Sequence, residues 1–159
     1  MTVPPDPAAI VDALRRTGRS VAVAESLTGG AVCARLVDVP GASEVVRGGV
    51  VAYATELKAT LLGVDELLLA AQGAVDPEVA EAMALGVRDR LGSTYGLATT
   101  GVAGPGPSEG KPAGTVYVAV ADADGAESLR LTLDGDRASI RAGTVEGVLA
   151  AFAERLGIS

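Results

Sequence analysis

Short apolar segments alternate along this chain with segments of helical periodicity, and no other feature of the sequence limits the fold so strongly. Apolar runs at 20–24, 48–53, 95–100 and 115–121 predict four strands. A fifth strand is predicted after the turn at Asp124-Gly125, where three leucines alternate with polar residues: Leu129, Leu131 and Leu133.

Helices are predicted between and after these strands. Asp6 followed by Pro7 indicates a helix start, and Gly18 indicates its end. Further helices are predicted over residues 31–37, 55–62, 65–71 and 77–91, and over a final segment with one apolar face. That face comprises Ile140, Thr144, Val148, Phe152 and Leu156. The order α-β-α-β-α-α-α-β-β-β-α predicts a single α/β domain over residues 1–159, a three-layer αβα arrangement with a mixed sheet of about five strands.

The composition restricts both the core and the partners. Apolar residues make up 48% of the 159 residues, but only three Tyr and one Phe are aromatic. The core is therefore expected to consist of Ala, Val and Leu, which lets helices approach a sheet closely. The net charge of −7 argues against nucleic-acid binding, which uses basic patches and, for single strands, aromatic stacking platforms.

No segment of the sequence is expected to enter a membrane or to direct secretion. No apolar run reaches the roughly 18 residues of a membrane span. The first residues lack the basic and apolar regions of a signal peptide. The single cysteine, Cys33, cannot form an internal disulfide, which suits a reducing compartment. We therefore expect a cytoplasmic protein.

The chain contains no histidine, which excludes a Ser-His-Asp triad, a Cys-His pair and a His-ligated metal site. Arginine predominates among the basic residues, and the lysines are Lys58 and Lys111. Lysine, unlike arginine, can act as a base when its pKa is lowered. A serine nucleophile in this chain would need a lysine, a tyrosine or a carboxylate as its base.

Polar clusters lie at the carboxyl ends of three predicted strands: Ser26 at the first, Tyr53 with Lys58 at the second, and Thr99-Thr100 at the third. Ligands of open α/β sheets bind at these strand ends. The turn at 25–30 either presents backbone N–H groups to an anion or is an ordinary capped turn. Lys58 is either a base for Ser26 or a solvated helix residue paired with one of two acidic neighbours, Glu56 or Asp65. Tyr53 is either a site residue or a core aromatic.

A long Gly- and Pro-rich loop at 101–114 is also a candidate for function, because structureless loops of this length are uncommon in compact domains. Thr100 and Gly101 could face an oxyanion or form a rigid strand exit. Arg137 and Arg141, four residues apart near a helix start, could bind a phosphate. Equally, they could bridge to two nearby acidic residues, Asp134 or Asp136.

Six segments occur in the order found in one family: AESLTGG, GGVVAYATELKATLLGV, GAVDPEVAEAMA, TTGVAGPGP, KPAGTVYVAVA and GDRASIR. On these segments, the chain resembles the CinA C-terminal domain family, which includes stand-alone nicotinamide-nucleotide amidases. The resemblance runs from about Ser20 to the final helix. It implies hydrolysis of the carboxamide of nicotinamide mononucleotide to nicotinic acid mononucleotide and ammonia, a step of pyridine nucleotide salvage in NAD metabolism.

The resemblance also implies roles for individual residues at a Ser/Lys amidase site that uses neither a metal nor a cofactor. Ser26 would be the nucleophile, Lys58 the base, and Tyr53 and Thr100 supporting groups. Arg137 would contact the substrate phosphate. The remaining residues expected to bind substrate belong to the turn after the first strand and to the long loop: Glu25, Thr28, Gly29, Gly30, Gly101 and Gly104.

Two positions depart from the family pattern: Thr55 stands where many members have Asn, and Pro107 where Gly is usual. Both departures bear on loop shape and substrate fit. The alternatives are an amidase for another small amide and a non-catalytic nucleotide-binding or competence-related regulatory module. The expected partner is a small-molecule nucleotide, with a homo-oligomer as a further possibility. No second, nucleotide-acting domain of the kind fused to some members is expected in this chain.

Overall fold

The computed structural model, which describes residues 4–158, contains one mixed sheet of five strands. The strands are β1 (Val21–Glu25), β2 (Val46–Val51), β3 (Tyr95–Gly101), β4 (Thr115–Asp122) and β5 (Gly125–Thr132). Their order in the sheet is β2-β1-β3-β4-β5. The β2-β1-β3 part is parallel, whereas β3, β4 and β5 pair antiparallel. The carboxyl ends of β1, β2 and β3 therefore lie at one edge of the sheet.

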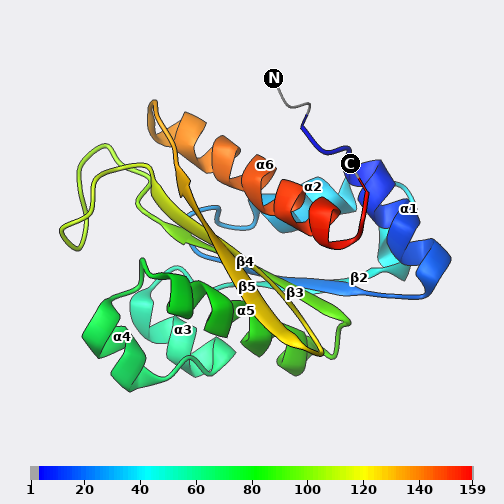
Figure 1. The fold of residues 1–159 in the computed structure, drawn as a ribbon, viewed down its shortest axis with the longest axis horizontal. Coiled ribbons are helices and arrows are strands. Elements are labelled where there is room, and N and C mark those ends of the chain that lie inside the picture. Colours follow the sequence, from blue (N-terminus) through cyan, green and yellow to red (C-terminus); the bar gives the residue numbers. More distant parts are fainter. Residues whose placement is uncertain (1–3, 159) are drawn as a thin grey trace.

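Helices cover both faces of this sheet (Figure 1). One face carries α1 (Pro7–Thr17), α2 (Ala31–Val37) and α6 (Arg137–Arg155). The other face carries α3 (Thr55–Leu62), α4 (Glu66–Gln72) and α5 (Pro77–Leu91). A short 3₁₀ helix, η1 (Ala42–Glu44), precedes β2. This arrangement confirms the predicted three-layer α/β fold with a mixed sheet. Within residues 4–158, no helix combines the length and apolar character needed to cross a membrane.

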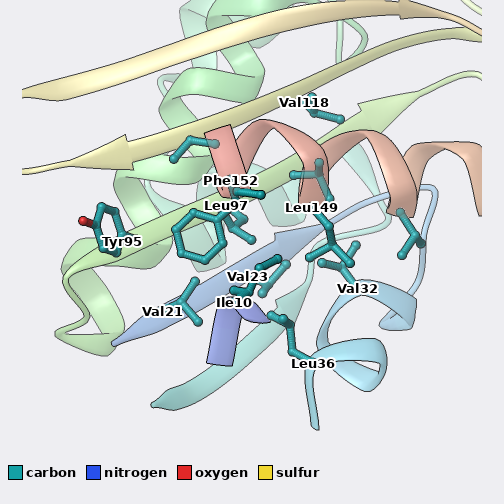
Figure 2. Packing of buried hydrophobic residues seen from close by; sticks show 14 of the residues in the cluster. Ile10, Val21, Val23, Val32, Leu36, Tyr95, Leu97, Val118, Leu149 and Phe152 are labelled. Atoms are coloured by element: carbon teal, nitrogen blue, oxygen red, sulfur yellow. The ribbon is translucent and has the colours of Figure 1, made fainter. Parts of the chain in front are cut away.

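The two faces have cores of different composition. Figure 2 shows Leu149 and Phe152 of α6 and Ile10 of α1 packed against Val23 and other large residues of the sheet. The Phe152 ring meets Tyr95 edge-on, with 5.2 Å between ring centroids. The opposite face of the sheet is built mainly from alanines, which α5 covers. These alanines are Ala22, Ala24, Ala98, Ala119 and Ala121. Small side chains there allow the close approach of α5 that the composition predicted.

Two details differ from the sequence predictions. β2 begins at Val46 and ends at Val51 rather than covering 48–53, because it is an edge strand whose burial alternates residue by residue and includes the polar Arg47. Leu129, expected on the apolar side of β5, is 52% exposed. Leu131 and Leu133 of the same alternation pack against the core. The other edge of the sheet is thus only partly covered.

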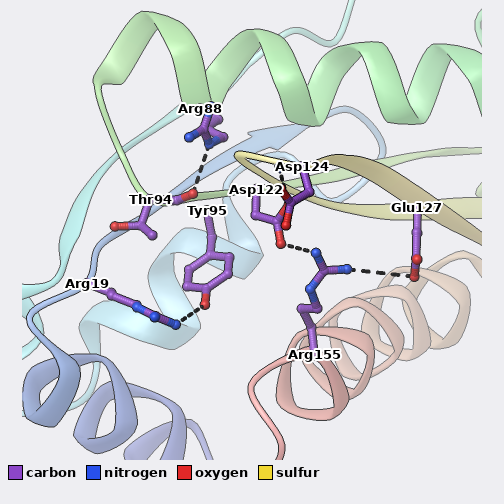
Figure 3. A network of polar contacts seen from close by, with 8 residues as sticks. All are labelled: Arg19, Arg88, Thr94, Tyr95, Asp122, Asp124, Glu127 and Arg155. Atoms are coloured by element: carbon purple, nitrogen blue, oxygen red, sulfur yellow. Dashed lines mark hydrogen bonds and ion pairs between the residues drawn. The ribbon is translucent and has the colours of Figure 1, made fainter.

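Polar contacts tie the helices to the sheet at the end where β3 begins and β4 ends (Figure 3). Arg155 of α6 forms ion pairs with Asp122 and Glu127. Arg19 donates to the Tyr95 hydroxyl at 2.9 Å, and Arg88 donates to the Thr94 carbonyl at 2.9 Å. This end lies opposite to the carboxyl ends of β1 and β3, so the ionic contacts and the candidate site occupy separate ends of the molecule.

Candidate active site

A cavity of about 380 Å³ opens at the carboxyl ends of the parallel strands. Separate parts of the chain contribute its wall: the ends of β1 and β3, the segment after β2, the β3–β4 loop and the start of α6. The predicted site residues in this wall are Ser26, Tyr53, Lys58, Thr100, Gly101, Gly104 and Arg137. The two residues that depart from the family pattern, Thr55 and Pro107, also line it.

Ser26 and Lys58, both buried, are in contact in the wall of this cavity. Ser26 directly follows β1, and its N–H donates to the Thr99 carbonyl at 3.1 Å, which extends the pairing of β1 with β3. Lys58 lies on α3 and is only 1% exposed, whereas Ser26 is 8% exposed. The Lys58 Nζ lies 3.0 Å from the Ser26 Oγ. The alternative of a solvated lysine paired with an acidic neighbour is therefore wrong.

The other contacts of Lys58 orient its amine. Nζ donates to the carbonyl oxygens of Ala52, at 2.8 Å, and Tyr53, at 3.3 Å. A neutral amine has two hydrogens and one lone pair. When both hydrogens engage these carbonyls, the lone pair is left for the Ser26 hydroxyl. Desolvation by burial lowers the pKa of Lys58 from 10.5 to about 8, against the opposing effects of Glu109 and Glu56.

Beyond the turn that follows Ser26, the start of α2 is capped by Glu25. The buried Glu25 carboxylate accepts hydrogen bonds from the N–H groups of Val32, at 2.9 Å, and Cys33, at 3.0 Å. These are groups that the start of α2 could have presented to an anion. The turn is also held from β3, because the hydroxyls of Thr28 and Thr99 lie 2.8 Å apart. The prediction that Glu25, Thr28, Gly29 and Gly30 bind substrate is not supported, because none of them lines the cavity.

Tyr53 and Arg137 form the rim of the cavity. The Tyr53 side chain is 59% exposed, so it is not the core aromatic of the alternative interpretation. Its hydroxyl accepts from an Arg137 guanidinium nitrogen at 3.2 Å, and the same guanidinium donates to the Gly104 carbonyl at 2.6 Å. Tyr53 therefore contacts Lys58 through its carbonyl, while its ring and the exposed Arg137 face the entrance.

Arg141 does not join Arg137 at the rim. Its guanidinium donates to the carbonyls of Leu27, at 2.9 Å, and Thr28, at 3.1 Å, so it fastens the turn that follows Ser26 to α6. Neither arginine forms the predicted bridge to Asp134 or Asp136. Asp136 instead accepts from the Ser139 N–H at the start of α6, and this hydrogen bond lowers the pKa of its carboxyl.

Glu109 is a cavity residue that was not among the predicted site residues. This residue lines the cavity and accepts hydrogen bonds from the N–H groups of Ala74 and Val75, which also line it. Thr100 contacts the same segment, since its hydroxyl donates to the Ala74 carbonyl at 2.8 Å. Glu109 could not be found from local spacing, because its partners lie 34 and 35 residues away. Its position in the long Gly- and Pro-rich loop at 101–114 was the only sequence feature that indicated a functional role.

The arrangement suits nucleophilic attack by a serine hydroxyl whose proton passes to a buried lysine. Among the described residues, no three His, Cys, Asp or Glu side chains gather as a metal site would require. Cys33 lies on α2 outside the cavity, and burial raises the pKa of its thiol. The cavity wall thus combines a serine hydroxyl in contact with a buried lysine and, at the rim, an exposed guanidinium.

Comparison with known proteins places this chain in a family. A sequence model of the CinA C-terminal domain matches residues 6–156. A CinA-like protein from Frankia casuarinae is 56% identical over 140 residues, which cover 88% of this chain and 32% of the relative. A CinA-like protein from Synechocystis sp. is 53% identical over 132 residues, 82% of this chain and 32% of the relative. The chain thus spans about a third of the length of these relatives.

Solved structures match over nearly their whole length. A CinA superfamily protein from Klebsiella pneumoniae has 32% identity and a TM-score of 0.92, covering 95% of each chain. The competence/damage inducible protein CihA from Agrobacterium tumefaciens has 33% identity and a TM-score of 0.89, covering 99% of each chain. The relatives found by sequence and the first of these structures thus carry the same family name, CinA.

Proposed function

Because the chain belongs to the CinA C-terminal domain family, we propose that it is a nicotinamide-nucleotide amidase. The reaction is hydrolysis of the carboxamide of nicotinamide mononucleotide to nicotinic acid mononucleotide and ammonia. The observation that carries the proposal is the contact of 3.0 Å between the Lys58 Nζ and the Ser26 Oγ at the base of the cavity. In a chain without histidine, this pair supplies both a nucleophile and a base.

The proposed reaction has two steps. Neutral Lys58 takes the Ser26 proton while Oγ attacks the carboxamide carbon, and the resulting ammonium returns that proton to the leaving nitrogen as the C–N bond breaks. Ammonia leaves, and the substrate acyl group stays on Ser26 as an ester. A water molecule then attacks the ester, Lys58 takes the water proton, and this proton returns to Oγ as the C–O bond to Ser26 breaks.

The developing oxyanion needs hydrogen-bond donors near Ser26. The N–H of Leu27, the next residue, donates to no other group of residues 4–158, and Leu27 lines the cavity. It is our candidate donor. The two hydrogen bonds from Arg141 hold the carbonyls of this turn, and so limit the rotation of its peptide planes.

The residues at the rim of the cavity favour a nucleotide over free nicotinamide as the substrate. Arg137 presents an exposed guanidinium beside the cavity, and guanidinium matches the geometry of phosphate oxygens. Tyr53 is an exposed aromatic ring at the same entrance. In the proposed complex, the carboxamide reaches Ser26 while the phosphate remains at the rim with Arg137.

The test is ammonia release by the purified protein from three compounds: nicotinamide mononucleotide, its nucleoside without phosphate, and free nicotinamide. We expect the mononucleotide to be preferred, by roughly 10- to 150-fold in kcat/KM over the nucleoside for one charge-assisted contact. Arg137→Ala should remove most of this preference. Ser26→Ala should abolish turnover in a protein that still melts normally, because within residues 4–158 the Ser26 hydroxyl makes one hydrogen bond, the contact with Lys58.

Three other outcomes of the ammonia-release assay would each favour a different function or binding mode. Equal turnover of the mononucleotide and the nucleoside would contradict the phosphate contact at the rim. Turnover of an unrelated small amide alone would indicate an amidase with another substrate. Binding of the mononucleotide without release of ammonia would favour a non-catalytic nucleotide-binding module.

A further inference from the structure

The loop of residues 102–114, between β3 and β4, is fastened to a distant part of the chain. In Figure 1 this yellow-green loop projects from the end of the sheet where α4 lies. The segment that it contacts joins α4 to α5 and includes Ala74 and Val75. Both residues are buried and line the cavity, so the loop and this segment together form part of its wall.

Side chains from the β3–β4 region hold all four polar backbone groups of Ala74 and Val75. The Glu109 carboxylate accepts from the Ala74 N–H at 3.0 Å and from the Val75 N–H at 3.1 Å. The Thr100 hydroxyl donates to the Ala74 carbonyl at 2.8 Å, and the Lys111 ammonium donates to the Val75 carbonyl. Hydrogen bonds with an ionised partner are stronger than neutral ones, so Glu109 and Lys111 contribute most to this contact.

The backbone is adapted to bring the carboxylate into place. Glu109 has a φ of 54°, the only positive φ outside glycine among residues 4–158. A residue with a side chain is held in this region only by its surroundings, and such positions cluster at functional sites. On the other side, a Cβ at Gly73 would lie 2.5 Å from a Glu109 carboxylate oxygen, so only glycine permits this approach.

We infer that Glu109 is a positioning residue, whose carboxylate fixes Ala74 and Val75 as cavity wall and thereby sets the shape that binds the substrate. The inference rests on the proposed function, because its effect is on the binding of the amide substrate. Ser26 and Lys58 are held by other contacts, with Thr99, Ala52 and Tyr53. Loss of Glu109 should therefore weaken substrate binding more than it slows the chemical steps.

The experiment compares wild-type protein with Glu109→Gly and Glu109→Gln. Glycine removes the carboxylate and tolerates the positive φ, so the variant introduces no new backbone strain. Glutamine keeps the shape but has one acceptor oxygen for two N–H groups. Amide hydrogen exchange of Ala74 and Val75, followed by NMR, reports the contact itself, and KM and kcat with nicotinamide mononucleotide report its use.

For Glu109→Gly we expect both amides to exchange about tenfold faster or more, and KM to rise by about tenfold, while kcat changes less than about threefold. Tenfold is the lower end of the effect of one charge-assisted hydrogen bond. Glu109→Gln should give the same pattern with smaller changes. Amides in the core of β3 should exchange as in the wild type, which would show that the fold is intact.

Glu56→Gln is the matched control. Glu56 lies exposed in the first turn of α3 and, like Glu109, acts through its charge on Lys58, but it has no contact with Ala74 or Val75. It should leave KM and the two exchange rates at wild-type values. If Glu56→Gln and Glu109→Gln change the kinetics alike, the role of Glu109 is electrostatic and the inference is wrong.

Two further results would overturn the inference. One is faster exchange of Ala74 and Val75 with an unchanged KM, because the contact would then be only structural. The other is an unchanged exchange rate in both Glu109 variants. In either case a wild-type protein that releases ammonia would leave the proposed function standing. A wild-type protein that neither binds nor hydrolyses the mononucleotide would overturn the proposed function and this inference together.

Discussion

Lys58 is a basic side chain enclosed among carbonyl and hydroxyl oxygens, and no carboxylate of residues 4–158 is in contact with it. Carbonyl oxygens accept hydrogen bonds from both forms of the amine, so they hold the side chain in place without preventing loss of its proton. A carboxylate in the same position would keep the amine charged. The burial of Lys58 thus accounts for its lowered pKa and for its suitability as a base.

Lys58→Arg separates a base from a positive charge. Guanidinium keeps the charge but does not release its proton near neutral pH. We expect Lys58→Arg and Lys58→Ala to lose activity alike, each by at least about 10²- to 10⁴-fold, the usual contribution of acid–base catalysis. Steady-state rates of ammonia release measure this. An arginine variant that keeps most of the activity would reduce Lys58 to an electrostatic contact and contradict the Ser/Lys mechanism.

The pH dependence of the rate follows from the same group. Because the neutral amine is the reactive form, kcat/KM should rise with pH and level off above an apparent pKa of about 8. Below that pKa, the rate should fall about tenfold for each pH unit, as the neutral fraction does. A profile from pH 6 to 10 on one substrate measures this. A profile that is flat down to pH 6 would show that Lys58 is not the base.

Lys58 also makes the stability of the fold depend on pH. Its pKa is about 8 in the folded protein and 10.5 when unperturbed, so between these values the unfolded chain binds more protons. Burial of the charged amine lowers the free energy of unfolding by its full amount below pH 8. This loss disappears as the pH rises to 10.5. Relative to Lys58→Met, wild-type protein should gain roughly 3 kcal/mol of unfolding free energy over this range. Urea denaturation at pH 7.5 and 10.5 checks the difference, and parallel changes in both proteins would contradict it.

At the residue scale, the sequence identified those site residues that neighbour a strand end. Ser26, Lys58 and Thr100 were candidates because polar residues followed apolar runs, and the structure brings them to one cavity. Glu25 could not be distinguished from these cavity residues. Nothing in the local sequence indicates that its carboxylate accepts hydrogen bonds from N–H groups at the start of α2. Arg141 and Glu109 act on segments that are distant in the sequence, so their partners could not be predicted.

At the scale of elements, α5 is placed by glycines as much as by apolar side chains. A Cβ at Gly86 of α5 would lie 2.0 Å from the carbonyl oxygen of Leu62 at the end of α3. A Cβ at Gly96 of β3 would lie 2.1 Å from the carbonyl oxygen of Ala84 on α5. Because Lys58 lies on α3, this close approach of α3 to α5 also positions the base.

Gly86→Ala should therefore destabilise the protein, although alanine normally stabilises a helix relative to glycine by about 0.5–1 kcal/mol. The contact is with backbone, which cannot rotate away, so we expect a net loss of roughly 1–3 kcal/mol. Gly143→Ala on α6 is the matched control, since its Cβ would meet only the end of the flexible Leu133 side chain at 3.1 Å. Thermal denaturation should separate the two variants by several degrees, and equal melting temperatures would contradict the close packing.

Several helices begin at an aspartate that caps them. Asp6, Asp76 and Asp136 each accept from N–H groups at a helix start, as Asp before a helix favours. The bounds of β2 were wrong because an edge strand alternates in burial, and Arg47 interrupts the apolar run that predicted it. The bounds of α2 and α3 were predicted to the residue although neither helix has a side-chain cap, whereas α4, which Asp65 caps, begins one residue later than predicted.

At the scale of the whole molecule, the order of elements predicted the three layers, but the order of the strands needed the structure. β1 lies between β2 and β3, so parallel strands from three separate parts of the chain end side by side. That order, together with the β3–β4 loop, brings Ser26, Lys58 and Glu109 to one cavity. Strand order depends on contacts between distant segments, which hydrophobic periodicity does not encode.

The composition of the whole molecule leads to the last prediction, which concerns metal removal. The chain has no histidine and one cysteine, so carboxylates would have to supply most ligands of any metal. The acidic residue in the cavity wall, Glu109, already binds two backbone N–H groups. The proposed chemistry needs only a hydroxyl and an amine. Ammonia release should therefore be unchanged, within about twofold, after exhaustive dialysis against EDTA. Activity that is lost and then restored by one specific divalent ion would contradict the Ser26–Lys58 mechanism, whereas equal loss with all chelators and no recovery would indicate damage to the protein.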